Sequence, residues 1–155
     1  MPRRKWLPPP EARNLRVVVP ASDTPQEEEV TIRIDEAQRL ATVILTGRAT
    51  AHGVVRAIRD LTSHPQYRPG IPKLWDARQA DLSKLTRAEF RSIARAGRVS
   101  ELSTLGTRVA VLVTRPVDFG MARMFELSEG YDLLDALRVF RDPDAAIAWL
   151  TQDEK

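Results

Sequence analysis

The chain has 155 residues and a formal net charge of +3, and 43% of its residues are hydrophobic and 29% charged. These values are typical of a single globular domain, and no apolar run approaches the roughly 18 residues of a membrane span. The sequence contains no cysteine, which excludes disulfides, thiolate catalysis and Cys-based metal sites. With only His52 and His64 as imidazoles, we expect no metal site and no cofactor.

The first 29 residues combine a proline run at 8–10 with an acidic run at 27–29. This composition packs poorly, so we expect an irregular segment with strand character only over 15–19. Residues 1–16 carry five basic side chains against one acid. A solvated tail is the favoured interpretation, and contact with nucleic acid or an anionic membrane is the alternative. Because the prolines leave no apolar segment for a secretory signal, we expect a soluble, cytoplasmic protein.

Residues 30–62 show the first regular patterns. Apolar residues alternate over 30–34, and an apolar stretch over 40–46 follows a turn, which predicts a β-hairpin. Thr50 is placed to cap a helix that Pro65 stops. The following Pro69-Gly70 pair suits the two central positions of a type II turn.

The middle of the chain continues the alternation of strand and helix. Residues 73–76 predict a short strand, and the capping box from Thr86 to Glu89 begins a helix that extends to about residue 100. Residues 109–113 are apolar at every position. This pattern predicts a strand near the middle of a parallel sheet, with helices on both faces.

Two further helices complete the pattern. A helix is expected over 116–129, ended by Gly130, and the strand ending near residue 140 leads into a helix capped by Asp142 with Pro143 in its first turn. The result is a leading strand followed by four β-then-α turns in one mixed sheet, with helices packed against it. The sequence therefore predicts a single α/β domain over 30–151, followed by a tail over 152–155.

Several stretches resemble the bacterial SpoIIAA-like (STAS/SEC14-type) family, over about residues 30–151. They are Tyr67-x-Pro-Gly, Leu74–Arg78, Gly120–Met124 and Val139–Leu150. The resemblance implies a SpoIIAA-like (STAS) fold, a superhelix of four βα turns. It also implies a non-enzymatic regulatory role, because well-understood relatives are anti-sigma-factor antagonists. In these relatives, phosphorylation of a serine at the start of the second helix breaks binding to a partner kinase.

The family's Asp-Ser pair at that helix start is absent here. Thr86 and Ser83 are the nearest candidates for phosphorylation, and a helix N-terminus favours a phosphate. The capping-box spacing from Thr86 to Glu89 also explains Thr86 without any modification.

Four arginines follow four successive strands of the predicted sheet. Because the carboxyl ends of parallel strands share one edge, we hypothesise that the arginines and a neighbouring acid form a rim that binds an anion. The anion would be a phosphorylated side chain of a partner, a lipid head group or a small carboxylate. The rim comprises Arg48, Asp76, Arg78, Arg115 and Arg141. The alternative is a set of unrelated solvated arginines.

A second candidate surface is apolar. Trp75, Met121, Met124 and Phe125 would line a hydrophobic pocket if they do not simply belong to the core. The SEC14-type half of the family name suggests a lipid as a ligand to test.

No catalytic signature is evident. The sequence has no Gly-rich phosphate loop and no nucleophile elbow, and no acidic ligand set flanks His52 or His64. We therefore expect a non-enzymatic interaction or regulatory domain that binds another protein. The alternative is a carrier or sensor of a small hydrophobic or anionic ligand, and homo-oligomerisation stays open.

Overall fold

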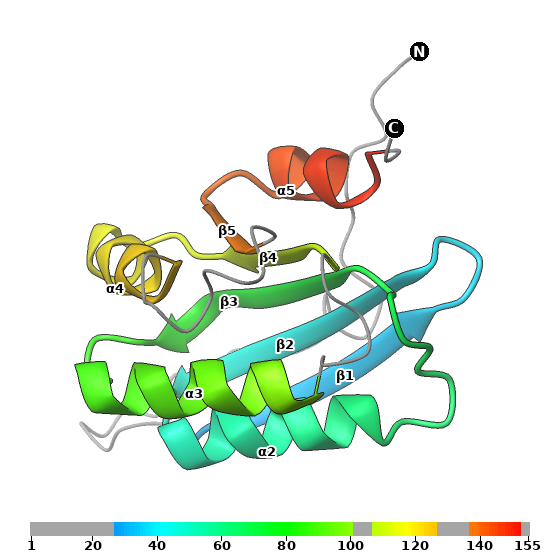
Figure 1. Cartoon of the computed structure of the whole chain (residues 1–155). Helices are drawn as coiled ribbons and strands as arrows, with labels where there is room; N and C mark the ends of the chain where they lie inside the picture. Colours follow the sequence, from blue (N-terminus) through cyan, green and yellow to red (C-terminus); the bar gives the residue numbers. More distant parts are fainter. Residues whose placement is uncertain (1–26, 101–106, 127–136, 153–155) are drawn as a thin grey trace.

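The computed structural model describes residues 27–100, 107–126 and 137–152, without the side chains of 98–100, 125 and 126. The strand expected over 15–19, the helix end at Gly130 and most of the tail lie outside the described residues. The described part holds one five-stranded mixed sheet and four helices, which confirms the α/β class (Figure 1).

The sheet follows the order of the chain. A hairpin of β1 (Glu29–Asp35) and β2 (Leu40–Arg48) begins it, and β3 (Lys73–Asp81), β4 (Val109–Leu112) and β5 (Leu137–Phe140) are added in turn. β1 pairs with β2 in antiparallel fashion, and the remaining strands pair in parallel. The predicted hairpin is confirmed.

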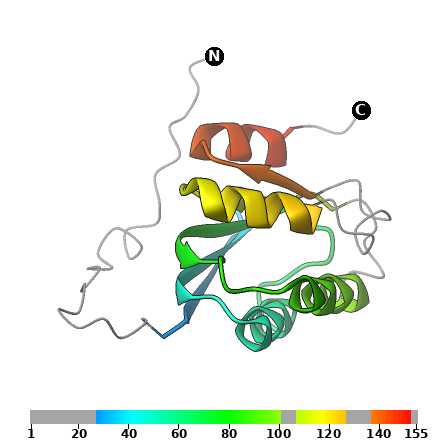
Figure 2. The ribbon, with the colours of Figure 1, turned by 90° about the vertical axis from the view of Figure 1, so that its left-hand side faces the viewer.

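The helices divide between the two faces of the sheet. α2 (Ala51–Thr62), α3 (Arg87–Ser100) and α4 (Pro116–Glu126) connect successive parallel strands and contribute to one apolar core. Crossovers of one hand that advance through neighbouring strands must lie on one face. α5 (Pro143–Leu150) packs on the opposite face, as Figures 1 and 2 show.

β4 separates these two cores. Val109 and Val111 pack against the core beneath α2 and α3, whereas the fully buried Ala110 and Leu112 belong to a second core that includes Leu150 of α5. β4 therefore has both of its faces covered, as its apolar sequence predicted.

β3 differs from the short strand expected over 73–76, since it continues to Asp81. The pairing with β2 shifts between Ile44 and Thr46, which opposes Thr46 to Gln79 and allows the ladder to continue. Such an irregularity adds a residue to one strand without ending the sheet. The local sequence 77–81 has little strand character, so the extension depends on β2 as its partner.

α4 also differs from the expectation, because its buried face is not the methionine face. Asp118 is 1% and Ala122 2% exposed, whereas Val117 is 50% and Met124 42% exposed. Met121 is half-buried against the core, and the side chain of Phe125 lies outside the described residues. α4 buries this face because the Asp118 carboxylate accepts hydrogen bonds from the buried Leu82 N–H and from Arg115.

The helix ends have the predicted caps. The Thr50 hydroxyl accepts a 3.0 Å hydrogen bond from the Gly53 N–H, and Asp142 accepts one of 3.2 Å from the Asp144 N–H. In addition, the Glu28 carboxylate accepts a 2.9 Å hydrogen bond from the Thr50 hydroxyl. A negative charge beside the first turn of α2 is favourable.

The C-terminal end of α5 is held by Arg108, the residue that directly precedes β4. Arg108 Nη1 donates to the carbonyl oxygens of Trp149 at 3.0 Å and of Gln152 at 2.6 Å. The guanidinium groups of Arg108 and Arg138 both lie over the Trp149 ring, at 5.8 and 5.2 Å from its centroid. Arg108 thus joins the segment before β4 to α5.

Candidate functional site

A groove with several basic side chains lies where β2 and β3 end, and its volume is about 450 Å³. We call it the basic groove. It is lined by Gly47, Arg48, Arg78, Gln79, Ala80, Asp81, Lys84 and Arg115. The structure therefore brings together three of the four arginines of the predicted rim, and it adds Lys84, which the sequence did not single out.

Arg115 is fixed by two carboxylates. Its Nε donates to Asp118 Oδ2 at 2.6 Å and its Nη2 donates to Asp118 Oδ1 at 3.0 Å, and Nη2 also lies 3.0 Å from Asp81 Oδ1. These bonds, first of all those to Asp118, raise the pKa of Arg115. The bidentate geometry holds the guanidinium in one orientation at the edge of the basic groove.

Asp118 also anchors the loop between β3 and α3. Its Oδ1 accepts a 2.9 Å hydrogen bond from the Leu82 N–H, and both groups are buried. Asp81, the last residue of β3, accepts from the Ser83 hydroxyl at 2.5 Å and from the Ser83 N–H at 2.9 Å. These two bonds, the hydroxyl's first, lower the pKa of Asp81, and Arg115 adds to the effect. The backbone beneath the groove is therefore well fixed.

Asp76 and Arg78 form an ion pair of their own. Arg78 Nε donates to Asp76 Oδ1 at 2.9 Å and Nη2 to Oδ2 at 2.7 Å, with Asp76 almost fully buried. Much of the Arg78 charge is thus compensated inside the protein. The Thr114 hydroxyl donates to the Arg78 carbonyl oxygen at 3.2 Å and ties this residue to the segment that follows β4.

Arg48 and Lys84 differ from these arginines. Both side chains are exposed, and within the described residues neither forms a hydrogen bond or an ion pair. They are the two cations of the groove whose charge is available to an external anion.

Arg141 does not line the basic groove. Its Nη2 donates to the Thr114 carbonyl oxygen at 3.1 Å, and its guanidinium lies 5.8 Å from the centre of the Phe119 ring. Arg141 therefore lies beside the segment that carries Arg115, but it is not among the residues that line the basic groove.

The two candidate phosphorylation sites both make local hydrogen bonds. The Thr86 N–H donates to Glu89 Oε2 at 2.7 Å, and the Glu89 N–H donates to Thr86 Oγ1 at 3.2 Å, which is the predicted capping box. Thr86 is exposed, whereas Ser83 is partly buried beside Asp81. Phosphorylation of either residue stays a prediction.

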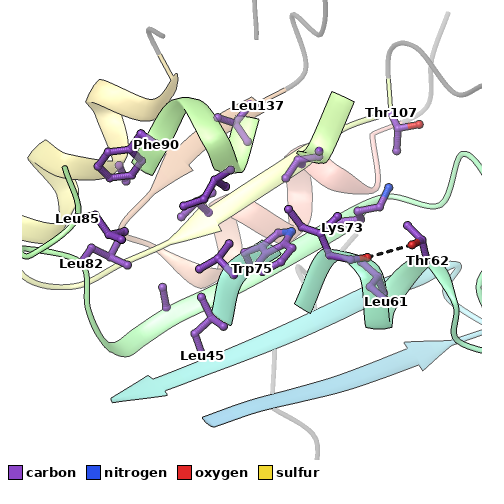
Figure 3. A pocket seen from close by; sticks show the side chains of 18 residues that line it. Leu45, Leu61, Thr62, Lys73, Trp75, Leu82, Leu85, Phe90, Thr107 and Leu137 are labelled. Atoms are coloured by element: carbon purple, nitrogen blue, oxygen red, sulfur yellow. Dashed lines mark hydrogen bonds between the residues drawn. The ribbon is translucent and has the colours of Figure 1, made fainter. Parts of the chain in front are cut away.

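An apolar cavity of about 100 Å³ lies between the sheet and the helices α2 and α3 (Figure 3). Of the residues of the predicted apolar pocket, Trp75 lines this cavity, whereas Met121 and Met124 do not. Lys73, which is 3% exposed, lines it too. The sequence offered one signal for Lys73, since it precedes Trp75 by two positions and strand residues at that spacing share a face.

The described ranges show neither a metal-binding cluster nor a membrane-spanning helix. They contain no group of three or more His, Asp or Glu side chains arranged to hold a metal ion. None of the helices in that part of the chain combines the length and apolar character that crossing a bilayer requires.

No protein-family model matches the sequence, and a search of curated proteins finds none that is similar to it.

Proposed function

We propose that this chain is a non-catalytic interaction domain that binds an anionic segment of a partner protein in the basic groove. The observation that carries the proposal is the pair Arg48 and Lys84, two exposed cations without a hydrogen-bonding or ionic partner in the described chain. Glutamate, aspartate and phosphorylated side chains share the negative charge that such a pair recognises.

The frame around this pair supports the proposal. Arg115 and Asp118 fix one edge of the groove through two parallel hydrogen bonds, and the Leu82 N–H bond fixes the loop that precedes Lys84. A site that is rigid before binding loses less conformational entropy when a partner docks. The resemblance to the SpoIIAA-like (STAS) family supports a regulatory role, since those relatives are non-enzymatic switches.

A regulatory step follows from the neighbours of Lys84. Ser83 and Thr86 lie one and two positions from it, so a phosphate on either residue would place negative charge next to the basic groove. The phosphate would repel an anionic partner and compete for Lys84. Phosphorylation would then release the partner, as it does in the family that the sequence resembles.

The test is a titration of ¹⁵N-labelled protein with three peptides of one sequence that carry phosphoserine, glutamate or serine at a central position. We expect the two anionic peptides to shift the amide signals of Gly47, Gln79 and Lys84, with an affinity that falls as salt rises. The serine peptide should bind weakly.

Charge-matched variants separate the groove from a general effect of net charge. Arg48→Gln/Lys84→Gln should weaken binding of the anionic peptides by about tenfold, because two charge contacts are lost. Arg91→Gln/Arg95→Gln removes the same charge from exposed positions of α3 and should leave binding unchanged. Thr86→Glu should weaken binding more than Thr86→Gln. Equal affinities for the two double variants, or the absence of binding by both anionic peptides, would reject the proposal.

A further inference from the structure

One side of α4 exposes apolar side chains to solvent. Val117 and Met124 are the two most exposed of the large apolar side chains that the structure describes. They are seven positions apart, which is about two helical turns, so both lie on the same side of α4. The exposed positions of α3, by contrast, include arginines at 87, 91 and 95. α4 therefore presents the kind of surface that a helix normally packs against another element.

The middle of this side is open. Gly120 lies between Val117 and Met124, and a Cβ atom added to it would meet no atom of the surrounding described structure within 4 Å. In Figure 2, α4 lies in front of the sheet, and no described helix or strand lies over it. We define the α4 patch as Val117, Gly120, Met121 and Met124, at positions i, i+3, i+4 and i+7 of the helix. This spacing, with a depression between two apolar side chains, suits the packing of a second helix.

The α4 patch adjoins the basic groove. Arg115, which lines the groove, is two positions before Val117, where the chain enters α4. Arg48 and Lys84 line the same groove, and both are exposed. An apolar surface that has cations on one side is complementary to a partner whose apolar side chains lie beside acidic ones.

We propose that the basic groove and the α4 patch bind one amphipathic helix of a partner protein, with its acidic side chains at Arg48 and Lys84 and its apolar side chains on the patch. The inference rests on the function proposed for the basic groove, and it adds an apolar anchor. Exposed ionic contacts are individually weak and are screened by salt, so charge alone discriminates poorly among acidic segments. Burial of apolar side chains on α4 supplies the additional affinity that selects one of them.

The test uses four helical peptides of one length. They combine glutamate or glutamine in the first turn with leucine or glutamine at the i, i+3, i+4 and i+7 positions, so that all four keep good helix formers. Binding is followed by the ¹³C-methyl signals of Val117 and Met124 and by the Lys84 amide signal. We expect the glutamate–leucine peptide to bind about tenfold more tightly than the glutamate–glutamine peptide, because only the former buries apolar area on α4. Both should shift the Lys84 signal, and only the leucine peptides should shift the methyl signals.

Three variants locate the apolar contact. Val117→Thr/Met124→Gln keeps the approximate size of both side chains and should abolish the advantage of leucine over glutamine. Gly120→Gln fills the open middle of the patch and should also reduce this advantage. It places a better helix former in open space, so the fold should not be weakened. Val30→Thr makes the matching change at an exposed position of β1 and should leave the advantage intact.

The outcomes distinguish this inference from the function of the basic groove. Equal affinities of the two glutamate peptides, both of which shift the Lys84 signal, would overturn the apolar anchor and leave the groove's function standing. An advantage of leucine that persists in both α4 variants would overturn the anchor as well. If neither glutamate peptide binds, the inference and the proposed function are both wrong.

Discussion

The carboxylate of Asp118 accepts a 2.9 Å hydrogen bond from the backbone N–H of Leu82, 36 positions earlier in the chain. Asp118 is 1% exposed, and its other hydrogen bonds come from Arg115. One side chain at the start of α4 thus fixes both the loop before α3 and an arginine of the basic groove. Buried carboxylates are tolerated only when they are hydrogen-bonded in this way.

Replacement of Asp118 by alanine should therefore destabilise the protein. The buried Leu82 N–H would lose its acceptor, whereas the half-exposed Arg115 can be rehydrated, so we expect a loss of about 2–3 kcal/mol in the free energy of unfolding. Urea denaturation measures it. Asp60→Ala, at an exposed position of α2, is the matched control and should change stability by less than about 0.5 kcal/mol. Similar losses in both variants would contradict the role of the Asp118 hydrogen bonds.

The acid dependence of stability should reflect Asp81. Its pKa is lowered from 3.8 in the folded state, chiefly by the Ser83 hydroxyl. The ionised form therefore stabilises the fold at pH values above 3.8, and this contribution is lost as the pH falls through the lowered pKa.

Ser83→Ala removes the first of these hydrogen bonds and should raise the Asp81 pKa toward its ordinary value. A ¹³C titration of the Asp81 carboxyl group measures the change directly. The variant should be less stable than the parent protein at neutral pH, and the difference should shrink once Asp81 is protonated. Ser92→Ala removes a hydroxyl that donates to a backbone carbonyl within α3, and it should leave the Asp81 pKa unchanged. An unchanged Asp81 pKa in Ser83→Ala would count against the hydrogen bond as its cause.

Two arginines around Trp149 should contribute unequally to stability. Both guanidinium groups lie near the ring, but Arg108 also donates to two carbonyl oxygens at the end of α5. We expect Arg108→Ala to lower the free energy of unfolding by about 1–2 kcal/mol, because charge-assisted hydrogen bonds are lost. Arg138→Ala should cost less, since it removes only a ring contact at an exposed position. Urea denaturation compares the two, and an equal loss would show that the carbonyl contacts add nothing.

Features with a local physical cause were predicted well. The caps at Thr50, Thr86 and Asp142 depend on side chains within three residues of the N–H groups that they accept from. The Pro69-Gly70 turn has Gly70 at φ +89°, in the region that a type II turn requires. The buried character of β4 followed from its unbroken apolar run.

Features that depend on distant partners were missed. The extension of β3 to Asp81 is stabilised by β2, and the buried face of α4 is set by an N–H in another loop. The sequence pattern predicted that Met124 is buried and gave no reason to bury Asp118. The hydrogen bonds that make burial of this aspartate favourable come from residues that the pattern does not include. Lys84 was not predicted as part of the basic groove for a similar reason. The residues that line the groove with it come from β2, from β3 and from the segment after β4, which are distant from it in the sequence.

The position of α5 bears on how the chain folds during its synthesis. α5 covers β3 and β4 on one face, and it is the last helix of the described chain. Leu74 and Leu112 therefore stay exposed on a growing chain until the ribosome has released residues 143–150. Before α5 is synthesised, this face of the sheet lacks the helix that covers it, and exposed apolar surface of this kind makes incomplete chains prone to aggregation.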